Sequence, residues 1–195
     1  MQRALRAVVV KDLADMRGQK RPLKPEYFEW SFGSGESPPL ELEGDHAIRL
    51  RGKVDRIDVD HENKTFLIID YKTGSGKITG KDIENGRALQ LPLYIHAVQR
   101  LLLPGYLPVG GLYFSLATMS MSDGFLRLDR VEDYFDFSMR SSSFMPPEQW
   151  QAVMDGALKQ VHELVADLYE GRFERSDQIC AAYCAYQDMC RCGMS

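Results

Sequence analysis

The 195-residue sequence lacks several features that would each define a class of protein. Its apolar runs, such as residues 8–10 and 101–103, are far shorter than the roughly 20 residues that span a bilayer. It shows no apolar N-terminal core of the kind found in secretory signal peptides, and no internal repeat or low-complexity segment. With 44% hydrophobic and 27% charged residues, the composition is that of about one globular domain, which excludes disordered and collagen-like chains.

Cysteine is absent from the first 179 residues. All four cysteines lie at the other end, with the spacing Cys180-x3-Cys184-x5-Cys190-x1-Cys192. A disulfide framework would distribute cysteines through the fold, so a local metal or cluster site competes with it from the start. We treat residues 176–195 as a C-terminal cysteine-rich segment.

Overall positive charge is also absent, because the formal net charge is −4. The distribution is uneven: residues 1–24 carry a local charge of +5, and the remaining residues carry −9. Carboxylates that hold metal ions would contribute to this acidic excess, so it does not exclude an enzyme that acts on DNA. The basic segment is either a surface that steers phosphates or a solvated helix face.

Hydrophobic periodicity predicts a mixed α/β protein with a central sheet and flanking helices. The expected helices cover residues 4–17, 87–103 and 147–169. The expected strands cover residues 26–32, 47–60, 65–72, 109–116 and 125–128.

The most informative stretch is residues 52–74, GKVDRIDVDHENKTFLIIDYKTG. If residues 61–64 form the loop of a hairpin, paired positions sum to 125, and Asp55 lies directly opposite Asp70. Side chains in such a pair have Cβ atoms ~4.5–5.5 Å apart. Lys72 shares the face of Asp70 because strand side chains alternate.

Two opposed carboxylates destabilise a hairpin unless a cation lies between them. This pair with a lysine at its edge suits Mg²⁺ or Mn²⁺, which prefer oxygen ligands and activate water for attack on a phosphate. Lys72 is suited to orient that water or to neutralise developing charge. The alternative is a surface hairpin with solubilising charges. It explains poorly why Asp70 follows the apolar run 66–69, since a carboxylate in a core strand is costly without a partner.

These residues resemble the paired motif of the PD-(D/E)XK nuclease superfamily. The form G-x-x-D-R-x-D followed by D-Y-K-T-G is similar to that of RecB/AddB-type exonuclease domains, as is Gln90-Leu91-Pro92-Leu93-Tyr94 to their Q-x-x-x-Y helix. The C-terminal cysteines resemble the iron–sulfur "staple" of many members. The resemblance runs from about Arg17 to Cys190. It implies an α/β, restriction-endonuclease-like domain over residues 1–195, with a central mixed β-sheet flanked by helices.

The resemblance assigns a role to each residue of the paired motif. Asp55 and Asp70 would be ligands of Mg²⁺ or Mn²⁺, and the backbone carbonyl of Tyr71 would complete part of the metal shell. Lys72 would be the catalytic lysine.

The resemblance also implies roles around this centre. Gln90 and Tyr94 would lie beside it and help to place the DNA strand, although Tyr94 is equally a candidate core residue of its helix. We expect Arg56 and Asp58 to face away from Asp55, as a structural ion pair or as support for the site. Glu29 occupies a strand in which the family often has an acidic residue, and at most it would support the metal ligands.

Members of this group usually carry, upstream of the first strand, a helix with a further His or Glu ligand and the first cluster cysteine. Both would precede Met1, so we expect the N-terminus of the domain to be truncated here. Cys180, Cys184 and Cys190 would then belong to a [4Fe-4S] site completed by an upstream ligand. A local zinc or cluster site and plain reduced cysteines are the alternatives.

The resemblance implies a Mg²⁺- or Mn²⁺-dependent DNA nuclease, acting as a single-strand exonuclease in recombination and repair. We expect it to act in the cytoplasm, and not at a membrane, on single strands or duplex ends. Its expected partner is a helicase, either a domain of the same protein or a separate subunit. One alternative is a catalytically inactive nuclease-like module that binds DNA or serves as a scaffold. Another is a CRISPR-associated single-strand exonuclease, a group that shares the motifs.

Overall fold

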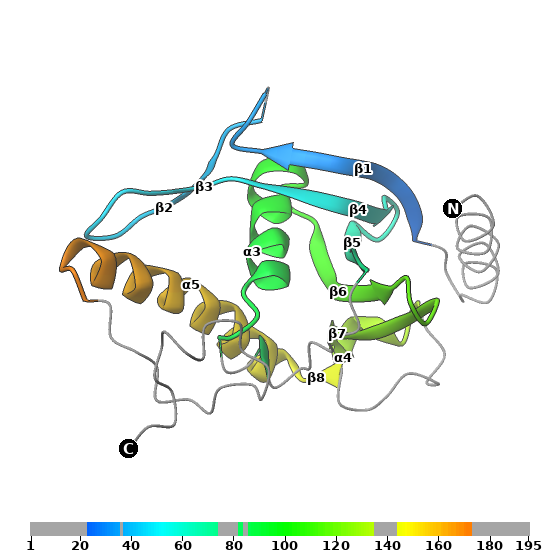
Figure 1. Ribbon diagram of the computed structural model, residues 1–195. Coiled ribbons are helices and arrows are strands. Elements are labelled where there is room, and N and C mark those ends of the chain that lie inside the picture. The colour runs from blue at the N-terminus through cyan, green and yellow to red at the C-terminus, as the bar shows by residue number, and fades with distance from the viewer. Residues whose placement is uncertain (1–22, 36, 74–81, 84–85, 135–143, 173–195) are drawn as a thin grey trace, which may run out of the picture.

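The computed structural model describes residues 23–35, 37–73, 82–83, 86–134 and 144–172 (Figure 1). The expected helix over residues 4–17 and the cysteine-rich segment lie outside these ranges. The strands are β1 (Lys24–Phe32), β2 (Leu40–Leu42), β3 (Ile48–Leu50), β4 (Gly52–Asp60), β5 (Thr65–Lys72), β6 (Leu107–Ser115), β7 (Ser120–Arg127) and β8 (Phe144–Met145). The helices are α3 (Gln90–Ala97), the π-helical turn η1 (Val98–Leu102), α4 (Leu128–Val131) and α5 (Pro147–Tyr169).

Six of the strands form one mixed sheet in the order β1-β4-β5-β6-β7-β8. The pairs β5/β6 and β7/β8 are parallel, and the other neighbours are antiparallel. Strands β2 and β3 pair only with each other, in a hairpin that reaches the C-terminal end of α5 (Figure 1). The architecture is the expected α/β restriction-endonuclease-like one, a central mixed sheet with helices packed against it.

Two hydrophobic cores cover the two faces of the sheet. Strand β5 separates them by simple alternation: Phe66 and Ile68 belong to the core under α3 and α5, whereas Leu67 and Ile69 belong to the core on the other face. All four of these side chains are at most 1% exposed. A strand that is buried on both faces reads as a continuous apolar run, which is the pattern of residues 66–69.

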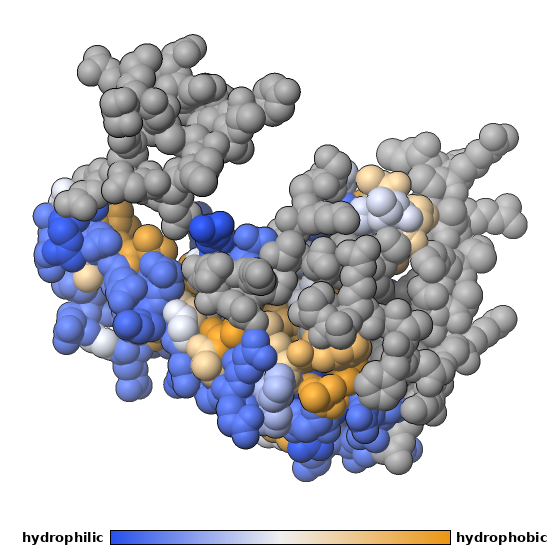
Figure 2. All heavy atoms as spheres, turned by 90° about the horizontal axis from the view of Figure 1, so that it is seen from below, coloured by the Kyte–Doolittle hydropathy of each residue, from blue (hydrophilic) through white to orange (hydrophobic). Residues whose placement is uncertain are grey.

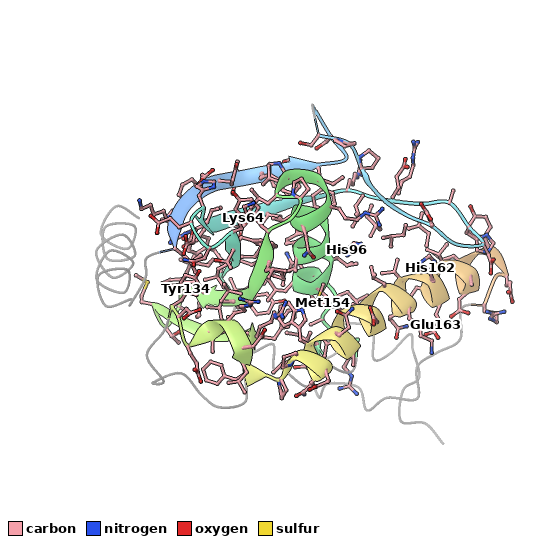
Figure 3. The ribbon with its side chains drawn as sticks, turned by 180° about the vertical axis from the view of Figure 1, so that it is seen from behind. Lys64, His96, Tyr134, Met154, His162 and Glu163 are labelled. Atoms are coloured by element: carbon pink, nitrogen blue, oxygen red, sulfur yellow. The ribbon has the colours of Figure 1, made fainter. Side chains whose placement is uncertain are left out.

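Helix α5 packs against α3 and adds Trp150, Val153, Met154 and Val161 to the first core. It begins at Pro147, where a proline is tolerated because the first helical N–H groups have no partner inside the helix. Figure 3 shows Met154 on the side of α5 that faces α3 and Glu163 on the opposite side, in agreement with a buried methionine and an exposed glutamate. Seen from below in Figure 2, hydrophobic side chains gather in the middle of the molecule and hydrophilic ones border them. Among the described residues, no helix combines the length and apolarity needed to cross a bilayer.

The structure divides the strand that the sequence predicted over residues 47–60. Its first part, β3, pairs with β2, and its second part, β4, pairs with β1 and β5. The break falls at Arg51, where the turn after β1 crosses the chain: a Cβ at Gly33, which has φ +73°, would lie 2.5 Å from the Cβ of Arg51. This close crossing at Arg51 separates the pairing of β3 with β2 from the pairing of β4 with β1 and β5.

The helix expected over residues 87–103 begins later, at Gln90. The N–H groups of Arg87 and Ala88 both donate to the carbonyl of Asp82, at 2.7 and 3.1 Å, so these residues belong to a turn. The helix continues through η1, where the N–H of Leu103 donates to the carbonyl of Val98 at 2.8 Å. The five-residue separation of that bond is the π-helical pattern.

The tight turn between β4 and β5 is fixed by one carboxylate. Asp60 accepts hydrogen bonds from the N–H groups of Glu62 and Asn63, from the Asn63 amide and from the Tyr134 hydroxyl, at 2.7–3.1 Å. Partial burial raises the pKa of Asp60, but these donated hydrogen bonds outweigh it and hold the pKa below its usual range. The turn therefore depends on the charged form of Asp60.

Replacing Asp60 should destabilise this turn. For Asp60→Ala we expect a loss of about 1–3 kcal/mol of unfolding free energy at pH 7, measured by urea denaturation, because several donors lose their acceptor. A carboxyl whose pKa is lowered by folding stabilises the fold above its unfolded pKa of about 4, and this stability is lost as the pH falls through the folded value. The difference between the two proteins should therefore shrink in acid. The exposed Asp45→Ala is the control, and equal losses in both variants would contradict the assignment.

Candidate active site

The hairpin of β4 and β5 has the predicted register. Its pairs run from Asp60 with Thr65 to Arg56 with Ile69, so that paired positions sum to 125. The backbone ladder ends there. At the next position a side chain replaces the backbone acceptor: Oδ2 of Asp55 accepts a hydrogen bond from the backbone N–H of Tyr71 at 2.8 Å. Asp55 is thereby anchored to the peptide bond between Asp70 and Tyr71.

Asp70 is a buried carboxylate at the end of a buried strand, with 3% of the residue exposed. The ammonium of Lys72 lies 2.6 Å from its Oδ2, and the lysine side chain is 31% exposed. Burial raises the pKa of Asp70 from its ordinary value, Lys72 opposes the increase, and the nearby Asp55 adds to it. The sequence thus correctly placed Lys72 on the face of Asp70.

Gln90, the first residue of α3, connects the two charges. Its Nε2 donates to Oδ1 of Asp70 at 2.8 Å, and its Oε1 accepts from Nζ of Lys72 at 2.7 Å. The amide nitrogen also lies 3.3 Å from the hydroxyl of Tyr94. Gln90 therefore reaches both the carboxylate and the lysine, and Tyr94 reaches Gln90, because side chains four apart share one face of a helix.

The position of α3 over the site depends on a glycine in β6. A Cβ at Gly111 would lie 3.2–3.3 Å from the side chain of Leu91, which is tighter than ordinary van der Waals contact. The absence of a side chain at Gly111 lets the first turn of α3 approach the sheet closely. Gln90 can then reach the carboxylate from above.

The predicted ion pair of Arg56 and Asp58 is present and buried, with 2% of each residue exposed. Nε of Arg56 donates to Oδ1 at 2.6 Å, and Nη2 donates to Oδ2 at 2.7 Å. Nη1 also donates to the hydroxyl of Tyr71 at 3.2 Å. The pair thus supports the side chain of Tyr71, whose backbone N–H holds Asp55.

Glu29 does not join the two carboxylates. Its side chain is 60% exposed and pairs with Lys53. Its backbone has φ 54°, an uncommon value for a residue other than glycine. Positive φ values in such residues are a form of local strain that occurs often at functional sites.

Tyr113, in β6, is part of the site and had no signal in the sequence. It lies beside Asp70 in the parallel pairing of β5 and β6, and its ring centroid is 5.2 Å from Nζ of Lys72. Burial, and then the charge of Asp70, raises the pKa of its hydroxyl. Only the register of β6 against β5 brings it there, and that pairing has no local sequence pattern.

The donor set fits a hard divalent cation in kind. The predicted set is two carboxylates and the backbone carbonyl of Tyr71, and Mg²⁺ is commonly held by one or two carboxylates together with water and substrate phosphates. Oδ2 of Asp70 is buried and accepts no well-aligned hydrogen bond from a described residue, so Lys72 alone compensates it. Within the described residues, no three His, Cys, Asp or Glu side chains lie close enough together to hold a metal ion. Two carboxylates are therefore what this part of the chain supplies.

This sheet, with its carboxylates, lysine and glutamine, defines a class of protein. The family model of the PD-(D/E)XK nuclease superfamily matches residues 1–191, and the chain belongs to that superfamily. The resemblance drawn from the motifs is thereby confirmed, and similarity to AddB-type proteins agrees with its RecB/AddB-type form.

Among similar proteins are three that are named as a component of an ATP-dependent helicase/deoxyribonuclease. The protein of Lacticaseibacillus casei is 33% identical over 125 residues, which is 57% of this chain and 10% of the relative. That of Moorella thermoacetica is 40% identical over 109 residues, or 51% of the chain and 9% of the relative. That of Clostridium botulinum is 40% identical over 80 residues, or 38% and 7%. The chain spans a tenth or less of the length of these relatives.

Removing the charge of Asp70 should stabilise the metal-free protein. Because folding raises the pKa of this carboxyl, its ionisation weakens the fold as the pH rises through the ordinary carboxyl range. In chelator at pH 7, we expect Asp70→Asn to be about 0.5–2 kcal/mol more stable than the wild type in urea denaturation. The gain should vanish near pH 3, where both side chains are neutral. A variant that is less stable than the wild type at pH 7 would contradict the unfavourable burial of this charge.

Proposed function

We propose that this chain hydrolyses phosphodiester bonds of DNA with Mg²⁺ or Mn²⁺. The observation that carries the proposal is the connected cluster in which Asp55, Asp70 and Lys72 meet at the end of β5, with Gln90 bound to both of the latter. A solubilising surface hairpin would have no reason to bury Asp70 or to bring a helix glutamine onto it. Membership of a nuclease superfamily supports the same conclusion.

Asp55, Asp70 and the carbonyl of Tyr71 would hold the metal ion. When bound, such an ion lowers the pKa of water for attack and stabilises charge on the phosphate. Lys72 supplies a fixed positive charge beside this position, suited to orient the attacking water or to balance the developing negative charge. Its ammonium is held by Asp70 and Gln90, so little reorganisation is needed during the reaction.

Gln90 and Tyr94 would help to place the DNA strand. The Gln90 amide joins Asp70 to Lys72, and the Tyr94 hydroxyl lies next to it on the same helix face. We infer that these two groups set the distance between the strand and the carboxylates. Both would then affect the affinity for DNA and the rate of cleavage.

We further propose single-strand exonuclease action in recombination and repair, together with a helicase, in the cytoplasm. The names of the three relatives, which join helicase and deoxyribonuclease, support a helicase partner. We propose that residues 1–195 form one nuclease domain, and that Cys180, Cys184 and Cys190 belong to a [4Fe-4S] site. These cysteines lie outside the described residues, so their assignment stays a prediction.

Single substitutions test the proposed reaction. For Asp55→Asn, Asp70→Asn and Lys72→Ala, we expect the rate of DNA degradation with Mn²⁺ to fall by a factor on the order of 10³, because each removes charge from the reacting centre. Release of nucleotides from end-labelled single strands is the measurement. Asp45→Ala is the matched control for loss of an exposed carboxylate and should retain full activity. Equal digestion by the wild type and Asp70→Asn would refute the proposal.

A DNA-binding module without catalysis is the second candidate. The limited set of two carboxylates among the described residues favours it. Titration with Mn²⁺, followed by the thermal unfolding midpoint, separates the two functions. A nuclease should be stabilised by Mn²⁺ in the wild type and not in Asp70→Asn, whereas a module should bind single strands with no response to the metal.

A further inference from the structure

Tyr113 lies under the ammonium of Lys72. The pairing of β5 with β6 sets Tyr113 beside Asp70, and Lys72 follows two residues later on the same face. The ring centroid of Tyr113 is 5.2 Å from Nζ of Lys72, within the roughly 6 Å at which an aromatic face attracts a cation. Tyr113 is only 2% exposed, so the ring is a fixed part of the core.

The ammonium is therefore held on three sides by three elements. Asp70 of β5 contacts it at 2.6 Å, Gln90 of α3 accepts its hydrogen bond at 2.7 Å, and the ring of Tyr113 in β6 lies beneath it. A lysine has a flexible four-carbon stem, so two polar contacts leave room for alternative rotamers. A rigid aromatic surface removes part of that freedom and excludes water from one side.

We propose that Tyr113 is a positioning residue for Lys72, and that its ring holds the ammonium at the catalytic centre. This inference rests on the proposed role of Lys72 in DNA hydrolysis. The ring, not the hydroxyl, performs the task, because the attraction of a cation comes from the aromatic face.

Three variants separate this role from a general contribution to the core. Tyr113→Phe keeps the ring, whereas Tyr113→Leu removes it. Phe125→Leu is the matched control, since Phe125 is a buried aromatic residue of the same core that stacks on Trp150. Thermal unfolding should show that both leucine variants lose stability, so that lost stability alone does not distinguish them.

Nuclear magnetic resonance reports the contact without any need for activity. In protein labelled with ¹³C at the lysine ε position, the Lys72 signal, assigned by its loss in Lys72→Arg, should be shifted upfield by the ring. The shift should persist in Tyr113→Phe and Phe125→Leu and disappear in Tyr113→Leu. In the wild type, a nuclear Overhauser effect should join the Lys72 ε protons to the Tyr113 ring protons. Its absence overturns the proposal even if the leucine variant does not fold.

Kinetics with single-stranded DNA then tests the consequence. We expect Tyr113→Leu to lower kcat by about 3- to 30-fold, the range that a cation–π contact supports, with less than a twofold change in KM. Tyr113→Phe should recover kcat to within threefold of the wild type, and Phe125→Leu should match the wild type. Equal losses in Tyr113→Leu and Phe125→Leu overturn the positioning role. An inactive wild type that shows the resonance contact would instead refute the proposed hydrolysis.

Discussion

The hydrogen bond from the backbone N–H of Tyr71 to the Asp55 carboxylate is the interaction on which the candidate site depends. It lies where the backbone pairing of β4 with β5 ends, and there a side-chain carboxylate accepts the hydrogen bond in place of a backbone carbonyl. The tight turn at Asp60 fixes the register at the other end of the hairpin, so a slip of one residue would move Asp55 to the opposite face. Turn chemistry at one end of two strands thus determines the position of a carboxylate at the other.

The remaining parts of the site come from elements that the hairpin cannot place by itself. Helix α3 must approach the sheet closely for Gln90 to reach Asp70, and this approach depends on Gly111 in β6. On the other face, the buried pair of Arg56 and Asp58 fixes the side chain of Tyr71. The peptide that carries the motif is therefore held from both sides of the sheet. Such support leaves little freedom at the groups proposed to act on the phosphate.

Local pattern in the sequence predicted the parts of the site that lie close in the chain. The hairpin register, the shared face of Asp70 and Lys72, and the helix face of Gln90 and Tyr94 all follow from periods of two and about four residues. The break of the long strand at Arg51 and the place of Tyr113 did not follow. Both depend on contacts between distant segments, a turn crossing at Gly33 and the parallel pairing of β6, for which the sequence carries no local signal.

Strand β5 carries favourable and unfavourable burial side by side. Residues 66–69 are buried on both faces, and each such apolar side chain contributes about 1.5–3 kcal/mol. One residue later, Asp70 is buried as a carboxylate, and its raised pKa shows that Lys72 compensates the burial only in part. Because an incompletely paired buried charge costs stability, the burial of the apolar run is what keeps the end of β5 in place. The fold can therefore hold a buried carboxylate whose charge is only partly neutralised and which would attract a further cation. A metal-dependent nuclease requires such a carboxylate.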